Sequence, residues 1–293
     1  MNLVIIPARD EAPTVGTVVR AAMAAPVRCD VLVVDDGSRD STAAEAREAG
    51  ATVIETGASR GYGAALMRGF GWALANGYGA VVTMDADGQH DAARLEDLVD
   101  GLADADIVSG TRYHDSSPSP LGQPPPDRLR LNRVLTRRIN EITGYALTDG
   151  FCGFKAYRTR SVATLALDEP GYGFPLQLWL LARRAGLRVV ERPVERIYLP
   201  VRRVFGGGLD DVERRRDYYE RVIERTLASA EGGERAALSR AADVRPRAGT
   251  SLVDKGHGFS YNGQALPVSE VARHSAPVVM NARAVQADSR KLP

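Results

Sequence analysis

Short apolar runs alternate with helical patterns along residues 3–109, and this alternation restricts the fold more than any other feature. Each run has the length of a buried strand and is followed by turn or capping residues and then a longer stretch with helical periodicity. The expected strands are residues 3–6, 31–34, 52–54, 80–84 and 106–109. Strands that alternate with helices through short connections predict an α/β fold, with a mostly parallel central sheet and helices on both faces.

The rest of the chain predicts further elements and then a loss of periodic pattern. The expected helices are residues 13–23, 41–49, 64–76, 92–102, 127–143, 174–185 and 210–228, and residues 188–194 are expected to form another strand. From Ala230 onward the apolar periodicity fades, and Ala, Arg, Gly and Ser dominate. We therefore expect a globular domain over residues 1–229 and a polar, disordered or weakly ordered tail over residues 230–293.

The composition excludes several classes of protein. Lys and Arg number 38 against 37 Asp and Glu, so no nucleic-acid partner is expected. Two cysteines provide no disulfide framework, and no apolar run approaches the roughly 18–20 residues of a membrane span. We expect a cytoplasmic protein, with peripheral contact at the inner face of the membrane as an option. The basic stretch 127–143 fits either a solvated face or contact with phosphate groups or a membrane surface.

Polar clusters follow three of the expected strands, at Pro7–Glu11, Asp35–Ser38 and Asp85–Asp91. In open α/β sheets, ligands bind beyond the carboxyl ends of the strands, where all three clusters fall. The sequence therefore predicts a ligand site at this edge of the sheet.

Asp85 and Asp87 form the most distinctive pair in these clusters. Residues two apart in a strand point to the same side, so both carboxylates are expected to aim at one spot. Such a pair repels unless a cation lies between its members, and Mg²⁺ or Mn²⁺ prefers oxygen ligands. Gln89 could add a neutral oxygen. The alternative is a polar turn in which Asp91 caps the next helix.

The other motifs have a functional and a structural interpretation. Asp35 and Asp36 could accept hydrogen bonds from a base or a ribose, or could stabilise a turn. The stretch Arg60–Gly63 could bring backbone amides to a phosphate, but it is not a dinucleotide fingerprint, because Leu66 occupies the third glycine position. Arg112, after the fifth strand, is either a phosphate clamp or a surface charge.

Five motifs in this order resemble the family-2 inverting glycosyltransferases. They are Asp35-Asp36-Gly37-Ser38, Gly61-Tyr62-Gly63, Asp85-Ala86-Asp87-Gly88-Gln89-His90, Ser109-Gly110-Thr111-Arg112-Tyr113 and Thr148-Asp149-Gly150-Phe151-Cys152-Gly153-Phe154-Lys155. The resemblance covers about residues 3–226 and is greatest to the dolichyl- and polyprenyl-phosphate mannosyl- and glucosyltransferases. It implies the GT-A nucleotide-diphospho-sugar transferase fold.

The resemblance also implies roles for single residues. The metal ligands would be Asp85, Asp87 and Gln89, which would hold Mg²⁺ or Mn²⁺ on the donor pyrophosphate. The nucleotide-sugar site would comprise Pro7, Glu11, Asp35, Asp36, Gly63, Asp85, Ala86, Asp87, Arg112, Arg133 and Arg203, the last in a loop that closes over the site. The catalytic groups would be Asp87, Arg112 and Asp149.

The implied reaction is the metal-dependent, inverting transfer of a hexose from a nucleoside-diphosphate sugar, of the GDP-mannose or UDP-glucose type, to a polyprenyl-phosphate-like acceptor. Gln177 stands where many polyprenyl-phosphate relatives carry an acid, which leaves Asp149 as the candidate base or acceptor-orienting group. The stretch Gly206–Asp210 lacks the Ser-Lys usual in the closing loop. A soluble glycosyltransferase that acts on a hydroxyl of a small metabolite or natural product is therefore the alternative.

Two other classes share some of these features. A sugar nucleotidyltransferase can begin with a stretch similar to Ile6-Pro7-Ala8-Arg9, but Glu11 and Pro13 stand where its glycine-rich basic loop would be. A catalytically degenerate module that only binds nucleotide sugars would tolerate the changes at Gln177 and at the closing loop.

Overall fold

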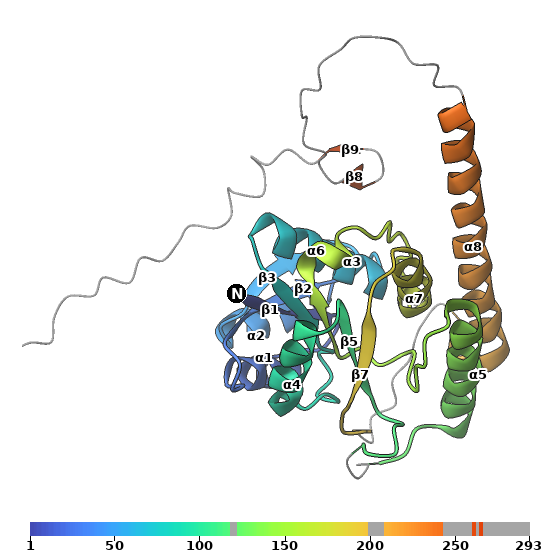
Figure 1. Ribbon diagram of the computed structural model, residues 1–293. Coiled ribbons are helices and arrows are strands. Elements are labelled where there is room, and N and C mark those ends of the chain that lie inside the picture. The colour runs from blue at the N-terminus through green and yellow to red at the C-terminus, as the bar shows by residue number, and fades with distance from the viewer. Residues whose placement is uncertain (118–121, 199–207, 243–259, 262–263, 266–293) are drawn as a thin grey trace, which may run out of the picture. The chain divides into compact units, whose positions relative to one another are not determined.

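A computed structural model describes residues 1–117, 122–198, 208–242, 260–261 and 264–265 (Figure 1). The chain divides into two compact units, Met1–Ala241 and Ala242–Pro293. The described part of the second unit is a short antiparallel pair of strands, β8 (Ser260–Tyr261) and β9 (Gln264–Ala265). The first unit contains the central sheet and every residue of the candidate site that the structure describes.

Seven strands form the central sheet in the order β3-β2-β1-β4-β6-β5-β7. Their bounds are β1 (Asn2–Ala8), β2 (Cys29–Asp35), β3 (Thr52–Glu55), β4 (Ala80–Thr83), β5 (Ile107–Thr111), β6 (Lys155–Arg158) and β7 (Val189–Pro193). All pairs are parallel except those of β6, which runs antiparallel to both β4 and β5. This arrangement confirms the predicted α/β fold with a mostly parallel sheet.

Helices cover both faces of the sheet (Figure 1). Their bounds are α1 (Val15–Met23), α2 (Thr42–Glu48), α3 (Tyr62–Ala75), α4 (Leu95–Asp100), α5 (Pro126–Thr143), α6 (Thr159–Val162), α7 (Phe174–Arg184) and α8 (Val212–Ala242), with 3₁₀ turns at Ala92–Arg94 and Gly101–Ala103. Alternate residues of β1 enter two separate cores: Leu3 and Ile5 pack with α3, α5, α7 and α8, whereas Val4 and Ile6 pack with α1, α2 and α4. This period-two alternation within an apolar strand is expected of a sheet buried on both faces.

The sequence predicted that the first strand ends at residue 6, before Pro7. This prediction is wrong, because β1 continues through Pro7 to Ala8. Met84 N donates to Ile5 O, so the odd residues of β1 direct their backbone groups towards β4. Pro7 faces the same side, but β4 has already ended at Thr83. The missing N–H of Pro7 therefore costs no ladder hydrogen bond.

Further elements differ from expectation, among them the short helix α6, which the sequence did not predict. The sequence did not predict β6, a four-residue strand with charged residues at both ends whose partners β4 and β5 lie far away in the sequence. Helix α8 extends to Ala242, beyond the expected end at residue 228. Ala, Glu and Arg favour helix even without an apolar stripe, which explains the extension. The domain boundary at residue 229 stays a prediction.

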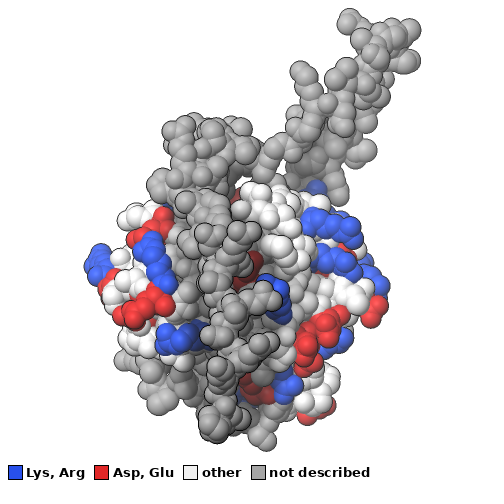
Figure 2. All heavy atoms as spheres, turned by 90° about the vertical axis from the view of Figure 1, so that its left-hand side faces the viewer, with Lys and Arg blue, Asp and Glu red and all other residues white. Residues whose placement is uncertain are grey.

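The charge distribution on the surface and the apolar character of the helices indicate which partners the protein could contact. On the face that Figure 2 shows, the described residues carry positive and negative side chains intermixed rather than a patch of one sign. Within the described ranges, no helix combines the length and the apolar character needed to cross a membrane.

Candidate active site

The loops after β1 and β2 are locked together by side chain–backbone hydrogen bonds. Asp10 adopts a left-handed conformation, with φ at 54°. Its amide donates to Ser38 Oγ at 3.0 Å, and its Oδ1 accepts from Arg39 N at 2.7 Å. The amide of Glu11 donates to Thr42 Oγ1 at 2.8 Å. The predicted nucleotide residue Glu11 therefore lies in a loop fixed by these bonds, and Pro7 lies near the carboxyl end of β1, at the same edge of the sheet.

Asp35 and Asp36, at the end of β2, are buried. Asp36 accepts from Arg60 N at 2.7 Å, from Gly61 N at 2.8 Å and from Ser59 Oγ at 2.7 Å. Its carboxylate therefore shapes the loop that leads into α3. Asp35 accepts from Ser38 N at 2.9 Å through Oδ1. The structure brings both to the expected edge, and their contact with a base or a ribose stays a prediction.

Gly63 lies at the start of α3, where this helix packs against residues 168–173, called the 168–173 segment below. A Cβ on Gly63 would lie 2.1 Å from Glu169 O, so only glycine fits. Ala64 N, in the first turn of α3, donates to Pro170 O at 3.1 Å. This geometry favours close packing, rather than phosphate binding, as the role of Gly63.

The predicted metal ligands follow β4. Asp85 has a side chain that is 33% exposed, and Tyr62 Oη donates to its Oδ1 at 3.2 Å. Asp87 is nearly buried and accepts from Gln89 N at 3.0 Å and from Gln89 Nε2 at 2.7 Å. Ala86, between them, packs into the core, so only its backbone can line the site.

These residues fit a divalent cation with substrate phosphates. Among the described residues, no group of three or more His, Cys, Asp and Glu forms a closed metal cage. Mg²⁺ commonly takes one or two carboxylates and completes its octahedron with water and substrate phosphate oxygens. Asp85 and Asp87 supply two carboxylates, and the hydrogen bond from Gln89 Nε2 to Asp87 leaves the Gln89 carbonyl oxygen as a further hard ligand.

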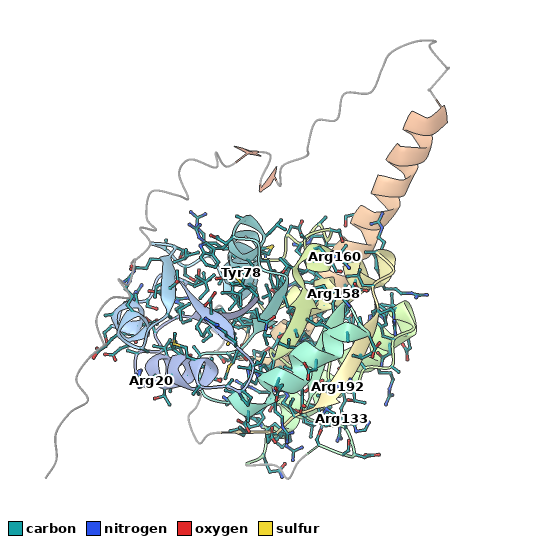
Figure 3. All side chains as sticks on the ribbon, turned by 60° about the vertical axis from the view of Figure 1, so that its left-hand side comes forward. Arg20, Tyr78, Arg133, Arg158, Arg160 and Arg192 are labelled. Carbon is teal, nitrogen blue, oxygen red and sulfur yellow. The ribbon has the colours of Figure 1, made fainter. Side chains whose placement is uncertain are left out.

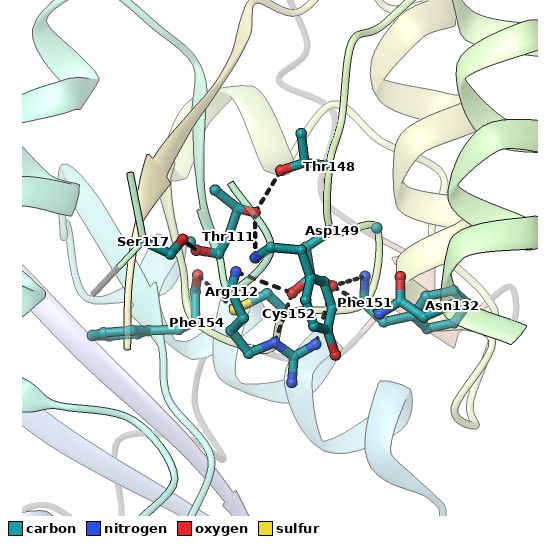
Figure 4. A network of polar contacts seen from close by, with 12 residues as sticks. Thr111, Arg112, Ser117, Asn132, Thr148, Asp149, Phe151, Cys152 and Phe154 are labelled. Carbon is teal, nitrogen blue, oxygen red and sulfur yellow. Dashed lines mark hydrogen bonds and ion pairs between the residues drawn. The ribbon is translucent and has the colours of Figure 1, made fainter. Parts of the chain in front are cut away.

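Arg112, whose side chain is 16% exposed, forms an ion pair with the fully buried Asp149 (Figure 4). The charges of both residues act on His90, which follows the predicted metal ligands. Arg112 Nε donates to Asp149 Oδ2 at 2.6 Å, and its NH2 donates to Oδ1 at 3.0 Å. Asn132 Nδ2, from α5, also donates to Oδ1 at 2.9 Å. Burial alone would raise the pKa of Asp149, but the charge of Arg112 and these hydrogen bonds hold that pKa below its usual value.

Asp149 is therefore poorly suited to act as a general base. It is fully buried, and its ionised oxygens are occupied by Arg112 and Asn132. A base must reach the proton that it removes and have a pKa near the working pH. The geometry instead gives Asp149 the task of fixing the guanidinium of Arg112.

The other predicted residues lie in different surroundings. Arg133 is exposed on α5 and makes no ion pair or hydrogen bond with another described residue (Figure 3). Arg203 lies outside the described residues. Gln177 is buried, and its Oε1 accepts from Asp168 N and Glu169 N, both at 2.8 Å. Position 177 therefore anchors the 168–173 segment in this chain.

The sequence model of glycosyl transferase family 2 matches residues 3–165. The chain belongs to this family. Polyprenol monophosphomannose synthase from Mycolicibacterium smegmatis is 34% identical to this glycosyltransferase over 203 residues, which cover 66% of the chain and 76% of that protein. Undecaprenyl-phosphate mannosyltransferase from Micrococcus luteus is 32% identical over 200 residues, covering 66% and 82%. The predicted resemblance to the polyprenyl-phosphate branch is confirmed.

Solved structures show the same fold at low sequence identity. Mannosyl-3-phosphoglycerate synthase from Rubrobacter xylanophilus superimposes with a TM-score of 0.60 at 19% identity, covering 79% of this chain and 75% of that one. Glucosyl-3-phosphoglycerate synthase from Mycobacterium tuberculosis, crystallised with Mn²⁺ and UDP, gives 0.57 at 21% identity, covering 78% and 79%. These neighbours confirm the GT-A fold of this glycosyltransferase.

Sequence reasoning missed two side chains that contact Asp85 in this glycosyltransferase, and a buried lysine whose charge interacts with its carboxylate. Tyr62 donates to its carboxylate. His90 Nδ1 accepts from Asp85 N at 3.1 Å, which requires an unprotonated nitrogen, and burial lowers the pKa of His90 to about 4. Lys155 is buried with its ammonium 5.2 Å from the ring centroid of Trp179. Tyr62, His90 and Lys155 were all in the quoted motifs, but only the fold shows that Tyr62 and His90 contact Asp85.

Proposed function

We propose that this glycosyltransferase transfers a hexose from a nucleoside-diphosphate sugar to a polyprenyl-phosphate-like acceptor, with inversion at the anomeric carbon and with a divalent cation. The observation that carries the proposal is the ion pair of Arg112 and Asp149, whose charges act together with that of Asp87 on His90, next to Asp85. In this pair Asp149 fixes the guanidinium of Arg112, whose NH1 group stays available to a phosphate oxygen, and the best candidate for a general base is occupied.

The proposed use of a nucleoside-diphosphate sugar rests on how the site would stabilise the charge of the leaving diphosphate. Breaking the bond between the sugar and the diphosphate builds negative charge on the leaving group. A cation held by Asp85 and Asp87 would neutralise part of that charge. Arg112 would stabilise the rest, since Asp149 occupies its Nε and NH2 and leaves NH1 available for a phosphate oxygen.

The proposed phosphate acceptor rests on the finding that neither Asp149 nor Gln177 is suited to act as a base. A hydroxyl acceptor loses a proton during attack and commonly needs a base, whereas a phosphate is already anionic near neutral pH. Asp149 is locked to Arg112, and Gln177 is a buried amide that holds the 168–173 segment. Both facts favour a phosphate acceptor. The names of the two relatives above, polyprenol monophosphomannose synthase and undecaprenyl-phosphate mannosyltransferase, support the same class.

The proposed location follows from the acceptor. A polyprenyl phosphate resides in a membrane, so a cytoplasmic enzyme would work at the inner face of that membrane. Helix α5 supports this, because Arg130, Arg133 and Arg137 are exposed along one side of it. Arginines on an amphipathic helix can bind anionic head groups.

The test compares acceptors at fixed Mn²⁺ concentration. Purified protein is incubated with labelled GDP-mannose or UDP-glucose and with undecaprenyl phosphate in detergent, or with the corresponding alcohol undecaprenol. We expect labelled lipid from the phosphate alone, with inverted anomeric configuration. Transfer to undecaprenol or to small hydroxyl compounds in preference to the phosphate would contradict the proposal. Pyrophosphate release from a nucleoside triphosphate would indicate a nucleotidyltransferase, and Mn²⁺-dependent donor binding without any transfer would indicate a binding module.

A further inference from the structure

Tyr62 is held at the start of α3 by its neighbours on both sides. The preceding Gly61 has φ at 105° and lies so close to the 168–173 segment that a Cβ would be 2.4 Å from Pro170 O. The ring of Tyr62 stacks on that of Tyr172, with centroids 5.7 Å apart and planes inclined by 19°. Backbone and ring together therefore fix the direction in which the phenol points.

The hydroxyl of Tyr62 points at the carboxylate of Asp85. It donates to Oδ1 at 3.2 Å. A tyrosine hydroxyl has an ordinary pKa of about 10, so it is protonated near neutral pH. A protonated phenol next to a carboxylate can only act as the donor, which gives the contact a fixed direction.

Asp85 meets fixed groups on its other side. A Cβ on Gly153 would lie 2.6 Å from Asp85 Oδ2, so the carboxylate rests against a bare stretch of backbone. The amide of Asp85 donates to His90, whose Nε2 is 3.7 Å from Oδ2. The side chain is nevertheless a third exposed, and a hydrogen bond to Oδ1 limits its rotation into solvent.

The 168–173 segment, which carries the Tyr172 ring stacked on Tyr62, is held in place by hydrogen bonds to α8. Gly173 N donates to Tyr218 Oη at 3.0 Å, and Tyr218 Oη donates to Glu169. Glu169 in turn accepts from Gly171 N at 2.9 Å. These bonds lie on either side of Tyr172, so the ring on which Tyr62 stacks has a defined position.

We propose that Tyr62 is a positioning residue that sets the orientation of the Asp85 carboxylate for binding of the cation–nucleotide complex. The proposal rests on the proposed function, because it assigns Asp85 to the donor site. Groups that hydrogen-bond to metal-binding carboxylates orient them, and their loss commonly weakens metal affinity.

The experiment measures Mn²⁺ affinity rather than turnover alone. Tyr62→Phe removes the hydroxyl and keeps the ring that stacks on Tyr172. The matched control is Tyr78→Phe, because Tyr78 Oη donates to Asp30 Oδ2 at 2.7 Å, an equivalent bond in which neither residue belongs to the predicted site (Figure 3). Binding of Mn²⁺ is followed by electron paramagnetic resonance in the presence of GDP and, separately, of UDP.

We expect Tyr62→Phe to weaken Mn²⁺ binding in the presence of the preferred nucleotide by roughly tenfold. Tyr78→Phe should leave this affinity within about twofold of the wild type, because its hydroxyl contacts no predicted ligand. A second variant, Tyr172→Leu, keeps the hydroxyl and removes the stack, and should give a smaller loss. Equal Mn²⁺ affinity of the Tyr62→Phe and Tyr78→Phe proteins would overturn the role of Tyr62. If the wild type itself bound no Mn²⁺ with either nucleotide, the proposed function would fail instead.

Discussion

At the scale of single residues, the state of Asp149 decides how the site can work. From the sequence, Asp149 was a candidate for either a general base or a group that orients the acceptor. The structure shows a fully buried carboxylate that accepts hydrogen bonds from Arg112 through both oxygens, and the charge of Arg112 holds its pKa below the usual value. A buried ion pair is costly to break, because removing one member leaves the other charge without compensation. The pair therefore holds Arg112 in one orientation.

Asp149→Asn tests this role. The amide keeps the shape but leaves the guanidinium of Arg112 without its counter-charge, so we expect a loss of roughly 3–5 kcal/mol in the free energy of unfolding. Urea denaturation measures this loss, and donor binding measures the effect on Arg112. The control is Asp97→Asn, since Asp97 is 59% exposed and pairs with Arg94 at 3.4 Å. A stable Asp149→Asn protein with unchanged donor affinity and reduced turnover would restore the base interpretation.

At the scale of elements, the start of α3 and the 168–173 segment fit each other through glycine. Gly63 and Gly71 belong to the same helix but face different surroundings. A Cβ on Gly63 would meet Glu169 O at 2.1 Å, whereas nothing lies within 4 Å of a Cβ on Gly71. Helix propensity alone favours alanine at both positions by about 1 kcal/mol.

The two glycines therefore predict opposite effects of alanine. Gly63→Ala should destabilise the protein by about 1–3 kcal/mol through overpacking, and it should weaken donor binding because the displaced segment carries Tyr172. Gly71→Ala should be neutral or stabilising by up to about 1 kcal/mol. Thermal unfolding of both variants measures the difference. A Gly63→Ala protein as stable as Gly71→Ala would show that the segment does not pack on α3 as described.

Asp106 connects the amino ends of three elements. Its Oδ1 accepts from Ser161 Oγ of α6 at 2.7 Å, and its Oδ2 accepts from Arg188 N, next to β7, at 3.0 Å. Asp106 itself immediately precedes β5. Burial opposes ionisation, but these two hydrogen bonds hold the pKa of Asp106 below its usual value.

A lowered pKa in the folded state predicts a definite pH dependence. The contribution of Asp106 to stability is complete above the unfolded-state pKa of about 3.9 and is lost as the pH falls through the lower folded-state pKa. Wild-type stability should therefore decline more steeply below about pH 4 than that of Asp106→Asn. Urea midpoints at pH 7, 5 and 3 measure the two profiles. Parallel profiles would show that the carboxylate contributes nothing through its ionised form.

At the scale of the whole molecule, the sequence predicted what is local and missed what depends on distant partners. The presence of the first five strands, the Asp91 cap and the polar edge follow from patterns within a few residues, and the structure confirms them. Strand β6 lacks an apolar run and exists because β4 and β5 pair with it on both sides. The ionised state of Asp149 depends on Arg112, 37 residues away, and no local pattern carries that information.

The extent of the folded domain is a further prediction at this scale. The last described buried side chains of α8 are Val222, Ile223 and Thr226. A chain that ends after residue 229 keeps all of them, so its melting temperature should fall by less than about 3 °C, or roughly 1 kcal/mol for a domain of this size. Calorimetry of the truncated and full-length chains measures the change. A larger loss would show that residues 230–293 stabilise the domain.

The central claim is that Asp85 and Asp87 hold a divalent cation on which sugar transfer depends. The most direct measurement is the initial rate of transfer from the preferred donor to undecaprenyl phosphate, for wild-type protein and for Asp87→Ala, after EDTA treatment and after Mn²⁺ is restored. We expect EDTA to lower the wild-type rate by at least roughly 100-fold, Mn²⁺ to restore it, and Asp87→Ala to stay inactive in both conditions. Near-wild-type turnover in EDTA, or a Mn²⁺-stimulated Asp87→Ala enzyme, would contradict this claim.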